Sequence, residues 1–165
     1  MSDILCVYYS RTGNTRRAIK EISMELDAEV VAISDEQNRG GWQGYIRSGM
    51  DAMRKSTHPL RPFQTEKPIE EYKLVIIGTP VWAGRCSSPI RGFLKRRGLE
   101  VTNAAYVLTR DGNRRCEAVY DQMDHYIAGK KRLFAVSLRP KSEGYNFWQD
   151  QFIRDVQRYM EQNHA

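Results

Sequence analysis

The stretch Ser10-Arg11-Thr12-Gly13-Asn14-Thr15 lies between an apolar run at residues 3–9 and a helical pattern at residues 15–26. The apolar run is β-branched or aromatic at most positions, which predicts a buried strand. In the helical pattern the apolar residues recur every three or four positions, which predicts a helix with one buried face. The quoted stretch is therefore predicted to turn the chain from a strand into a helix.

A second stretch, Gly78-Thr79-Pro80-Val81-Trp82-Ala83-Gly84, has the same setting. It comes after a continuous apolar run at residues 72–78, as expected of a strand covered on both faces. A helical pattern at residues 89–97 follows, and Ser88 and Pro89 fit an N-cap and the first helical position. Both stretches are therefore predicted to be loops that connect a strand to a helix.

The rest of the chain continues this alternation. We expect strands at residues 29–33, 104–109 and 132–138, and helices at residues 113–126 and 145–163. Five strands alternating with helices predict an α/β fold, a doubly wound parallel sheet with helices on both faces.

The connection at residues 34–71 is longer than the others and polar. Within it, large apolar side chains recur at helical spacing: Trp42, Tyr45, Ile46, Met50 and Met53. This pattern predicts a helix, for which two roles stay open. The helix either covers the sheet as part of the structure, or it shields a cofactor or docks a partner.

The chemistry of the first stretch suits a phosphate monoester. At the start of a helix, unpaired backbone N–H groups and the positive end of the helix dipole attract anions. The hydroxyls of Ser10, Thr12 and Thr15 add donors. Asn14 adds an amide, and Gly13 lets the chain turn close to the anion. A capped turn without a ligand is the alternative interpretation. The stretch lacks the P-loop and Gly-x-Gly-x-x-Gly fingerprints, which argues against nucleoside triphosphates and dinucleotides.

The second stretch adds an aromatic side chain. In open α/β sheets, ligands bind beyond the carboxyl ends of the strands, where the strand order reverses. If the first and third strands are adjacent, the two loops flank one crevice, and Trp82 can stack on a flat ring there. Backbone groups between Pro80 and Gly84 can then reach the polar edge of the ring. A phosphate and a flat ring together predict flavin mononucleotide (FMN) as the cofactor.

Residues 9–15 and 78–84 resemble the phosphate loop and the first ring-binding loop of flavodoxin-like proteins, and the resemblance covers essentially the whole chain. It extends to Gly41-Trp42-Gln43-Gly44-Tyr45 and to residues 48–52, which are similar to a bacterial flavodoxin-like branch. The resemblance implies a flavodoxin-like five-stranded sheet of order 2-1-3-4-5, the order that flavodoxin itself exemplifies. The fifth strand has no room for a large insertion, so the chain resembles the short-chain type.

The resemblance also implies which residues bind FMN. Six residues are implied to hold the phosphate: Ser10, Arg11, Thr12, Gly13, Asn14 and Thr15. The isoalloxazine ring is implied to pack on Trp82 within the first ring loop, which comprises Pro80, Val81, Trp82, Ala83 and Gly84. The second ring loop corresponds to Thr109, Arg110, Asp111, Gly112 and Asn113.

Three features depart from the usual flavodoxin pattern. Flavodoxins are typically strongly acidic, whereas this chain has a formal net charge of +6. Their second ring loop often carries a Tyr that stacks on the outer face of the ring, and residues 109–113 contain none. Ile19 takes the place of a small Ala early in the first helix, which is expected only to repack that helix.

Length, charge and cysteine content indicate the number of domains, the class of partner and the cellular location. The length predicts one domain, residues 1–165. Basic residues are spread over helix ends and loops without a nucleic-acid-binding motif, so an acidic protein or a small anion is favoured over nucleic acid. Three scattered cysteines form neither a disulfide framework nor a zinc site, and Cys6 is predicted to be a core thiol. Without a membrane span or a signal peptide, we expect a cytoplasmic location and no membrane insertion.

Three functions are compatible with these features. The first is an electron-transfer flavoprotein of the flavodoxin type, which shuttles electrons between redox partner proteins with acidic docking surfaces. The second is an FMN-dependent reductase of a quinone, a tetrapyrrole or another small acceptor, and the third is an interaction module without flavin. No residue in the loops is a compelling general acid or base, so no catalytic residue and no metal ligand is predicted.

Overall fold

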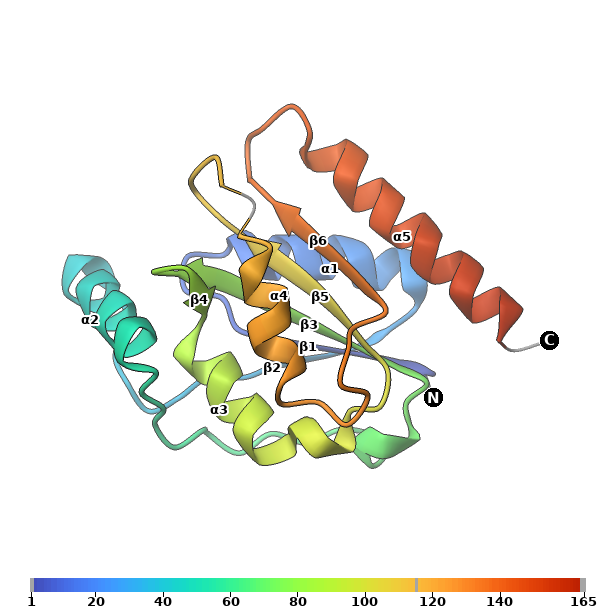
Figure 1. Ribbon diagram of the computed structural model, residues 1–165, viewed down its shortest axis with the longest axis horizontal. Helices are drawn as coiled ribbons and strands as arrows, with labels where there is room; N and C mark the ends of the chain where they lie inside the picture. Colours follow the sequence, from blue (N-terminus) through green and yellow to red (C-terminus); the bar gives the residue numbers. More distant parts are fainter. Residues whose placement is uncertain (1, 115, 164–165) are drawn as a thin grey trace.

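The structure is a computed structural model that describes residues 2–114 and 116–163. Figure 1 shows a central sheet with helices on both sides. The elements in chain order are β1 (Ile4–Tyr8), α1 (Asn14–Leu26), β2 (Glu29–Ala32), α2 (Gly41–Arg54), η1 (Ile69–Glu71), β3 (Leu74–Trp82), β4 (Arg85–Cys86), α3 (Ser88–Arg97), η2 (Gly98–Glu100), β5 (Ala104–Thr109), α4 (Ala118–Asp124), β6 (Phe134–Leu138) and α5 (Tyr145–Gln162).

The sheet has the predicted topology with one addition. Its main strands are parallel and lie in the order β2-β1-β3-β5-β6. Counting parallel strands only, this is the order 2-1-3-4-5, so the predicted fold class is confirmed. The addition is β4, which pairs antiparallel with the end of β3 and brings Arg85 opposite Trp82. Ala83 and Gly84 make the turn between them, both at positive φ (49° and 72°), as tight hairpins require.

The helices cover the two faces of the sheet in pairs. The side chains of α1 and α5 pack on one face, around Cys6 and Ile76. Those of α3 and α4 pack on the other face, around Ile77 and Tyr106. Cys6 is fully buried, as predicted, and burial raises the pKa of its thiol to about 12. None of the helices in residues 2–114 and 116–163 combines the length and the apolar character needed to span a bilayer.

Ile19 fits the core because its neighbour on β3 is a glycine. The Ile19 side chain is fully buried against Gly78. A Cβ atom at position 78 would lie 2.6 Å from Cγ1 of Ile19, well inside van der Waals contact. The large side chain on α1 therefore occupies the space that a glycine on β3 leaves open, in line with the expected repacking of the helix.

Two predicted helix starts are wrong. The helix predicted to begin at residue 113 begins at Ala118, because Cys116 adopts a left-handed conformation (φ 57°) that a helix does not allow. In α3 the N-cap position belongs to Ser87, and Ser88 is the first helical residue. The Ser87 hydroxyl accepts a hydrogen bond from Thr79 (3.0 Å), which ties α3 to β3.

The connection at residues 34–71 contains the predicted helix, α2, but not as a cover for the sheet. In Figure 1, α2 lies at the left edge of the molecule, next to β4. Its buried residues are the small ones, Gly44, Ser48 and Ala52. The large apolar side chains point outward, including Trp42 (71% exposed) and Tyr45 (63% exposed). The helix thus packs through its small face and leaves its apolar face at the surface.

Candidate functional site

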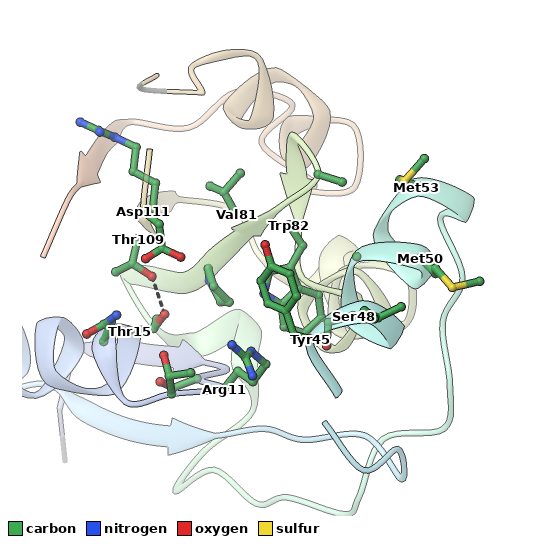
Figure 2. A pocket seen from close by; sticks show the side chains of 18 residues that line it. Arg11, Thr15, Tyr45, Ser48, Met50, Met53, Val81, Trp82, Thr109 and Asp111 are labelled. Carbon is green, nitrogen blue, oxygen red and sulfur yellow. Dashed lines mark hydrogen bonds between the residues drawn. The ribbon is translucent and has the colours of Figure 1, made fainter. Parts of the chain in front are cut away.

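A cavity of about 370 Å³ lies at the carboxyl ends of β1, β3 and β5, where the strand order reverses (Figure 2). Twelve of the predicted residues line it: Ser10, Arg11, Thr12, Asn14, Thr15, Pro80, Val81, Trp82, Ala83, Thr109, Arg110 and Asp111. Gly13, Gly84, Gly112 and Asn113 lie outside its lining. The two loops recognised in the sequence therefore border one cavity, while their role in binding FMN stays a prediction.

The β1–α1 loop (residues 9–13) presents an open helix start to the cavity. Gly13 adopts a left-handed conformation (φ 103°), and its backbone N–H donates to the Ser10 hydroxyl (3.0 Å). The helix α1 begins at Asn14 without a side-chain cap and without an acidic residue in its first turn. Neither a capping side chain nor a carboxylate therefore competes for the N–H groups of the first turn, which can receive an anion.

The hydroxyls of Thr15 and Thr109 join two of the loops. Figure 2 shows this hydrogen bond at the end of the cavity away from α2, and the two oxygens are 2.7 Å apart. Both residues are buried. Only one of the two hydroxyl hydrogens is used in this bond, so the other can be donated to a ligand in the cavity. The pair fixes the start of α1 against the end of β5.

Trp82 is held by two neighbours. The rings of Tyr9 and Trp82 meet edge to face, at a centroid distance of 5.5 Å and an interplanar angle of 84°. The guanidinium of Arg39 lies over the indole ring, 5.1 Å from its centroid. Burial raises the pKa of Tyr9 to about 12, so its hydroxyl stays protonated at neutral pH. Trp82 is thus partly buried and held at the cavity by the Tyr9 ring and the Arg39 guanidinium.

Arg39 connects Trp82 to α2 through a buried ionic network. Its side chain donates to Asp35 (2.6 Å and 3.2 Å), to the Ser48 hydroxyl (3.1 Å) and to Asp51 (2.9 Å). Burial alone lowers the pKa of Arg39, but its hydrogen bonds with the two carboxylates outweigh burial and raise it. His58 approaches the same Asp51 carboxylate at 3.2 Å. The network therefore fixes α2 beside the cavity.

The helix α2 forms a side of the cavity that could not be assigned from the sequence. This side is lined by six residues: Tyr45, Ile46, Ser48, Gly49, Met50 and Met53. Four of them belong to the apolar pattern noted in the sequence, for which shielding a cofactor was one of two open roles. The sequence therefore contained the apolar pattern of this helix, but such a pattern does not show whether the apolar side chains face a core or a cavity.

The β5–α4 loop (residues 110–117) brings positive charge to the cavity. Arg110 is half-buried and donates to the Ser137 hydroxyl (2.9 Å) and to the carbonyl of Gly112 (2.6 Å). Asn113 instead borders a smaller polar hollow of about 170 Å³ that shares Arg110 with the main cavity. Arg114 is exposed, and Arg115 lies outside the described residues.

Known proteins resemble this chain in structure, whereas no match was found by sequence. No protein-family model matches the chain, and no curated protein matches it. A flavoprotein from Lactobacillus acidophilus NCFM, crystallised in complex with FMN, is 19% identical with a TM-score of 0.66, over 90% of this chain and 99% of that one.

Two further solved structures are similar in fold. The flavodoxin of Streptococcus pneumoniae TIGR4 is 16% identical with a TM-score of 0.61, over 94% of this chain and 98% of that one. A WrbA-like flavodoxin from Agrobacterium tumefaciens is 13% identical with a TM-score of 0.60, over 96% and 99%. The chain therefore has the flavodoxin-like fold.

Proposed function

We propose that the cavity binds FMN and that the protein uses this cofactor to transfer electrons between redox partner proteins. The observation that carries the proposal is that the β1–α1 loop and Trp82 border the same cavity. The loop offers donors that suit a phosphate, and Trp82 offers aromatic surface that suits the isoalloxazine ring. The Lactobacillus flavoprotein, which shares the fold and was crystallised with FMN, supports the proposal.

The residues present fit FMN in charge as well as in shape. Near the open start of α1, the hydroxyls of Thr12 and Thr15 and the guanidinium of Arg11 all line the cavity. At its other polar border, Arg110 and Asp111 line the cavity. A cation such as Arg110 near a bound flavin would stabilise negative charge gained on reduction. When bound, FMN would supply the redox chemistry, and the chain would hold, orient and electrostatically tune it.

Ligand titration tests the cofactor assignment. The apo-protein is titrated into FMN, riboflavin and FAD, and flavin fluorescence reports binding. We expect FMN to bind at least tenfold more tightly than riboflavin, because each charge-assisted hydrogen bond to the phosphate contributes about 1.5–3 kcal/mol. Equal affinities for FMN and riboflavin would contradict the phosphate assignment.

Positive charge around the cavity supports partners with acidic surfaces. Arg85 and Arg110 are half-buried, Arg114 is exposed, and none of the three pairs with a carboxylate among the described residues. Exposed charges of one sign steer an oppositely charged protein toward the site. In anaerobic stopped-flow experiments, we expect slow flavin reduction by NAD(P)H alone and fast reduction when an acidic reductase protein is added. The fast rate should fall as salt rises, because salt screens exposed charges.

One observation favours a second candidate, an FMN-dependent reductase of a small acceptor. Besides the polar loops, the cavity is lined by Ile46, Met50 and Met53 of α2, which are all exposed. This apolar side suits an uncharged, flat acceptor such as a quinone. Rapid reduction by NADH or NADPH without a protein partner, followed by multiple turnovers with a quinone, would make this candidate the better one.

A further inference from the structure

Arg11 and Tyr45 form a contact between two sides of the cavity that are far apart in sequence. Arg11 belongs to the β1–α1 loop and Tyr45 to α2, and both line the cavity. The guanidinium carbon of Arg11 lies over the Tyr45 ring, 5.4 Å from its centroid. This distance is within the range of a cation–π interaction. The contact therefore connects the polar loop directly to the helix on the other side.

Arg11 has donors left for a ligand. It forms no ion pair with a carboxylate among the described residues, and it is only half-buried. A guanidinium uses its flat face to stack on a ring and its edge to donate N–H groups in the plane. The two uses do not compete. Arg11 can therefore keep its face on Tyr45 while its edge donates to a phosphate beside the loop.

Tyr45 is well placed to contact a flat ring. The cavity lining contains two aromatic side chains, Trp82 and Tyr45. The helix α2 packs through the small, buried residues Gly44 and Ser48, whereas Tyr45 on the same helix is 63% exposed. The β5–α4 loop offers no aromatic residue at positions 109–113. Tyr45 is thus the available second aromatic contact for a ring that packs on Trp82.

We propose that Arg11 and Tyr45 act together as a clasp on the cofactor: the phosphate orients Arg11, and Arg11 holds Tyr45 against the isoalloxazine ring. This inference rests on the proposed binding of FMN. Arg11 is a positioning residue for Tyr45 in addition to its contact with the phosphate. The clasp makes the aromatic contact depend on the phosphate, so Tyr45 contributes more to the binding of FMN than to the binding of riboflavin.

A double-mutant cycle with two ligands tests the clasp. Dissociation constants for FMN and riboflavin are measured for the wild type, Arg11→Gln, Tyr45→Ala and the double variant. We expect Tyr45→Ala to weaken FMN binding roughly 5- to 10-fold when Arg11 is present, and less than about threefold in the Arg11→Gln background. With riboflavin, the effect of Tyr45→Ala should be at least threefold smaller and nearly independent of residue 11.

Matched controls separate the clasp from general effects. Trp42→Ala removes another largely exposed aromatic residue from the same helix, outside the cavity lining, and should leave both dissociation constants unchanged. Arg16→Gln removes one positive charge near the loop, also outside the lining, and should show no coupling to Tyr45→Ala. Tyr45→Phe keeps the ring and should retain wild-type affinity. Circular dichroism and thermal unfolding of each apo-protein verify folding.

The outcomes are distinguishable. Coupling between positions 11 and 45 that is larger with FMN than with riboflavin supports the clasp. Equal coupling with both ligands, or a Tyr45→Ala variant that binds FMN like the wild type, overturns it while leaving the proposed cofactor intact. A wild-type protein that does not bind FMN, or that binds riboflavin equally well, overturns the proposed function itself.

Discussion

Replacing Gly44 by alanine tests how α2 is attached to the protein. A Cβ atom at position 44 would lie 2.0 Å from the carbonyl carbon of Arg39 and 2.1 Å from its oxygen. These are backbone atoms, so they cannot turn aside as a flexible side chain does. Gly44→Ala should therefore force α2 away from Arg39. Gly49 is the matched control on the same helix, because a Cβ atom there meets nothing within 4 Å.

The size of the effect follows from the contacts that would be lost. Restoring ordinary contact requires α2 to withdraw by about 1.5 Å. That displacement breaks the hydrogen bonds from Arg39 to Ser48 (3.1 Å) and Asp51 (2.9 Å). Hydrogen bonds to charged groups contribute about 1.5–3 kcal/mol each, and alanine regains about 1 kcal/mol of helix propensity. We expect Gly44→Ala to lower the free energy of unfolding by about 2–5 kcal/mol.

Urea denaturation of the apo-protein, followed by far-UV circular dichroism, measures this loss. Gly49→Ala should instead raise the free energy of unfolding by about 0.5–1 kcal/mol, because alanine favours the helix over glycine. Hydrogen exchange adds a local measurement: Gly44→Ala should speed the exchange of amides in α2 and leave those of β5 unchanged. If Gly44→Ala is as stable as Gly49→Ala, the close approach of α2 to Arg39 is refuted.

Four further substitutions or measurements address the site and the core. Thr12→Ala should weaken FMN binding by about 1–3 kcal/mol and leave riboflavin binding unchanged; equal losses for both ligands would contradict a phosphate contact. Trp82→Ala should weaken FMN binding by about 0.5–1.5 kcal/mol more than the loss of buried apolar area alone, and it should alter the visible spectrum of the flavin. An unchanged spectrum would mean that the isoalloxazine ring does not contact Trp82. Arg110→Glu should lower the midpoint potential of bound flavin by on the order of tens of millivolts, and a potential that stays or rises refutes this. Burial raises the pKa of Cys86 to about 11, so a thiol reagent at pH 8 should label it only after unfolding, and rapid labelling of the native protein would contradict its burial.

The strands β1, β3 and β5 could be predicted because they are continuous apolar runs that are buried on both faces. Their order came from the resemblance rather than from the runs themselves. The strand β4 could not be predicted, because two residues carry no periodic pattern. It depends on the positive φ angles of Ala83 and Gly84, which only the folded chain reveals. The late start of α4 has a similar cause, since nothing in the sequence marks the left-handed conformation of Cys116.

The two polar and aromatic loops of the site could be predicted because their chemistry is local. Hydroxyls, a glycine and the start of a helix are adjacent in sequence, and so are the residues around Trp82. The side formed by α2 could not be placed, because an apolar stripe on a helix ordinarily faces the core. Two features turn the small face of this helix inward instead. Arg39 is buried and paired with Asp35 and Asp51, and Gly44 lies in close contact with the backbone of Arg39.

The packing of Ile19 on Gly78 means that these two positions share one fixed volume. A larger residue at position 78 can be accommodated only if position 19 becomes smaller, because α1 and β3 are otherwise in full contact. Among related chains, the two positions are therefore expected to vary together, with glycine opposite a branched side chain and a larger residue opposite alanine. The first turn of α1, with its uncapped N–H groups, lies at the cavity. The combined size of the side chains at positions 19 and 78 therefore also sets how closely this turn can approach β3, the strand that ends in Trp82.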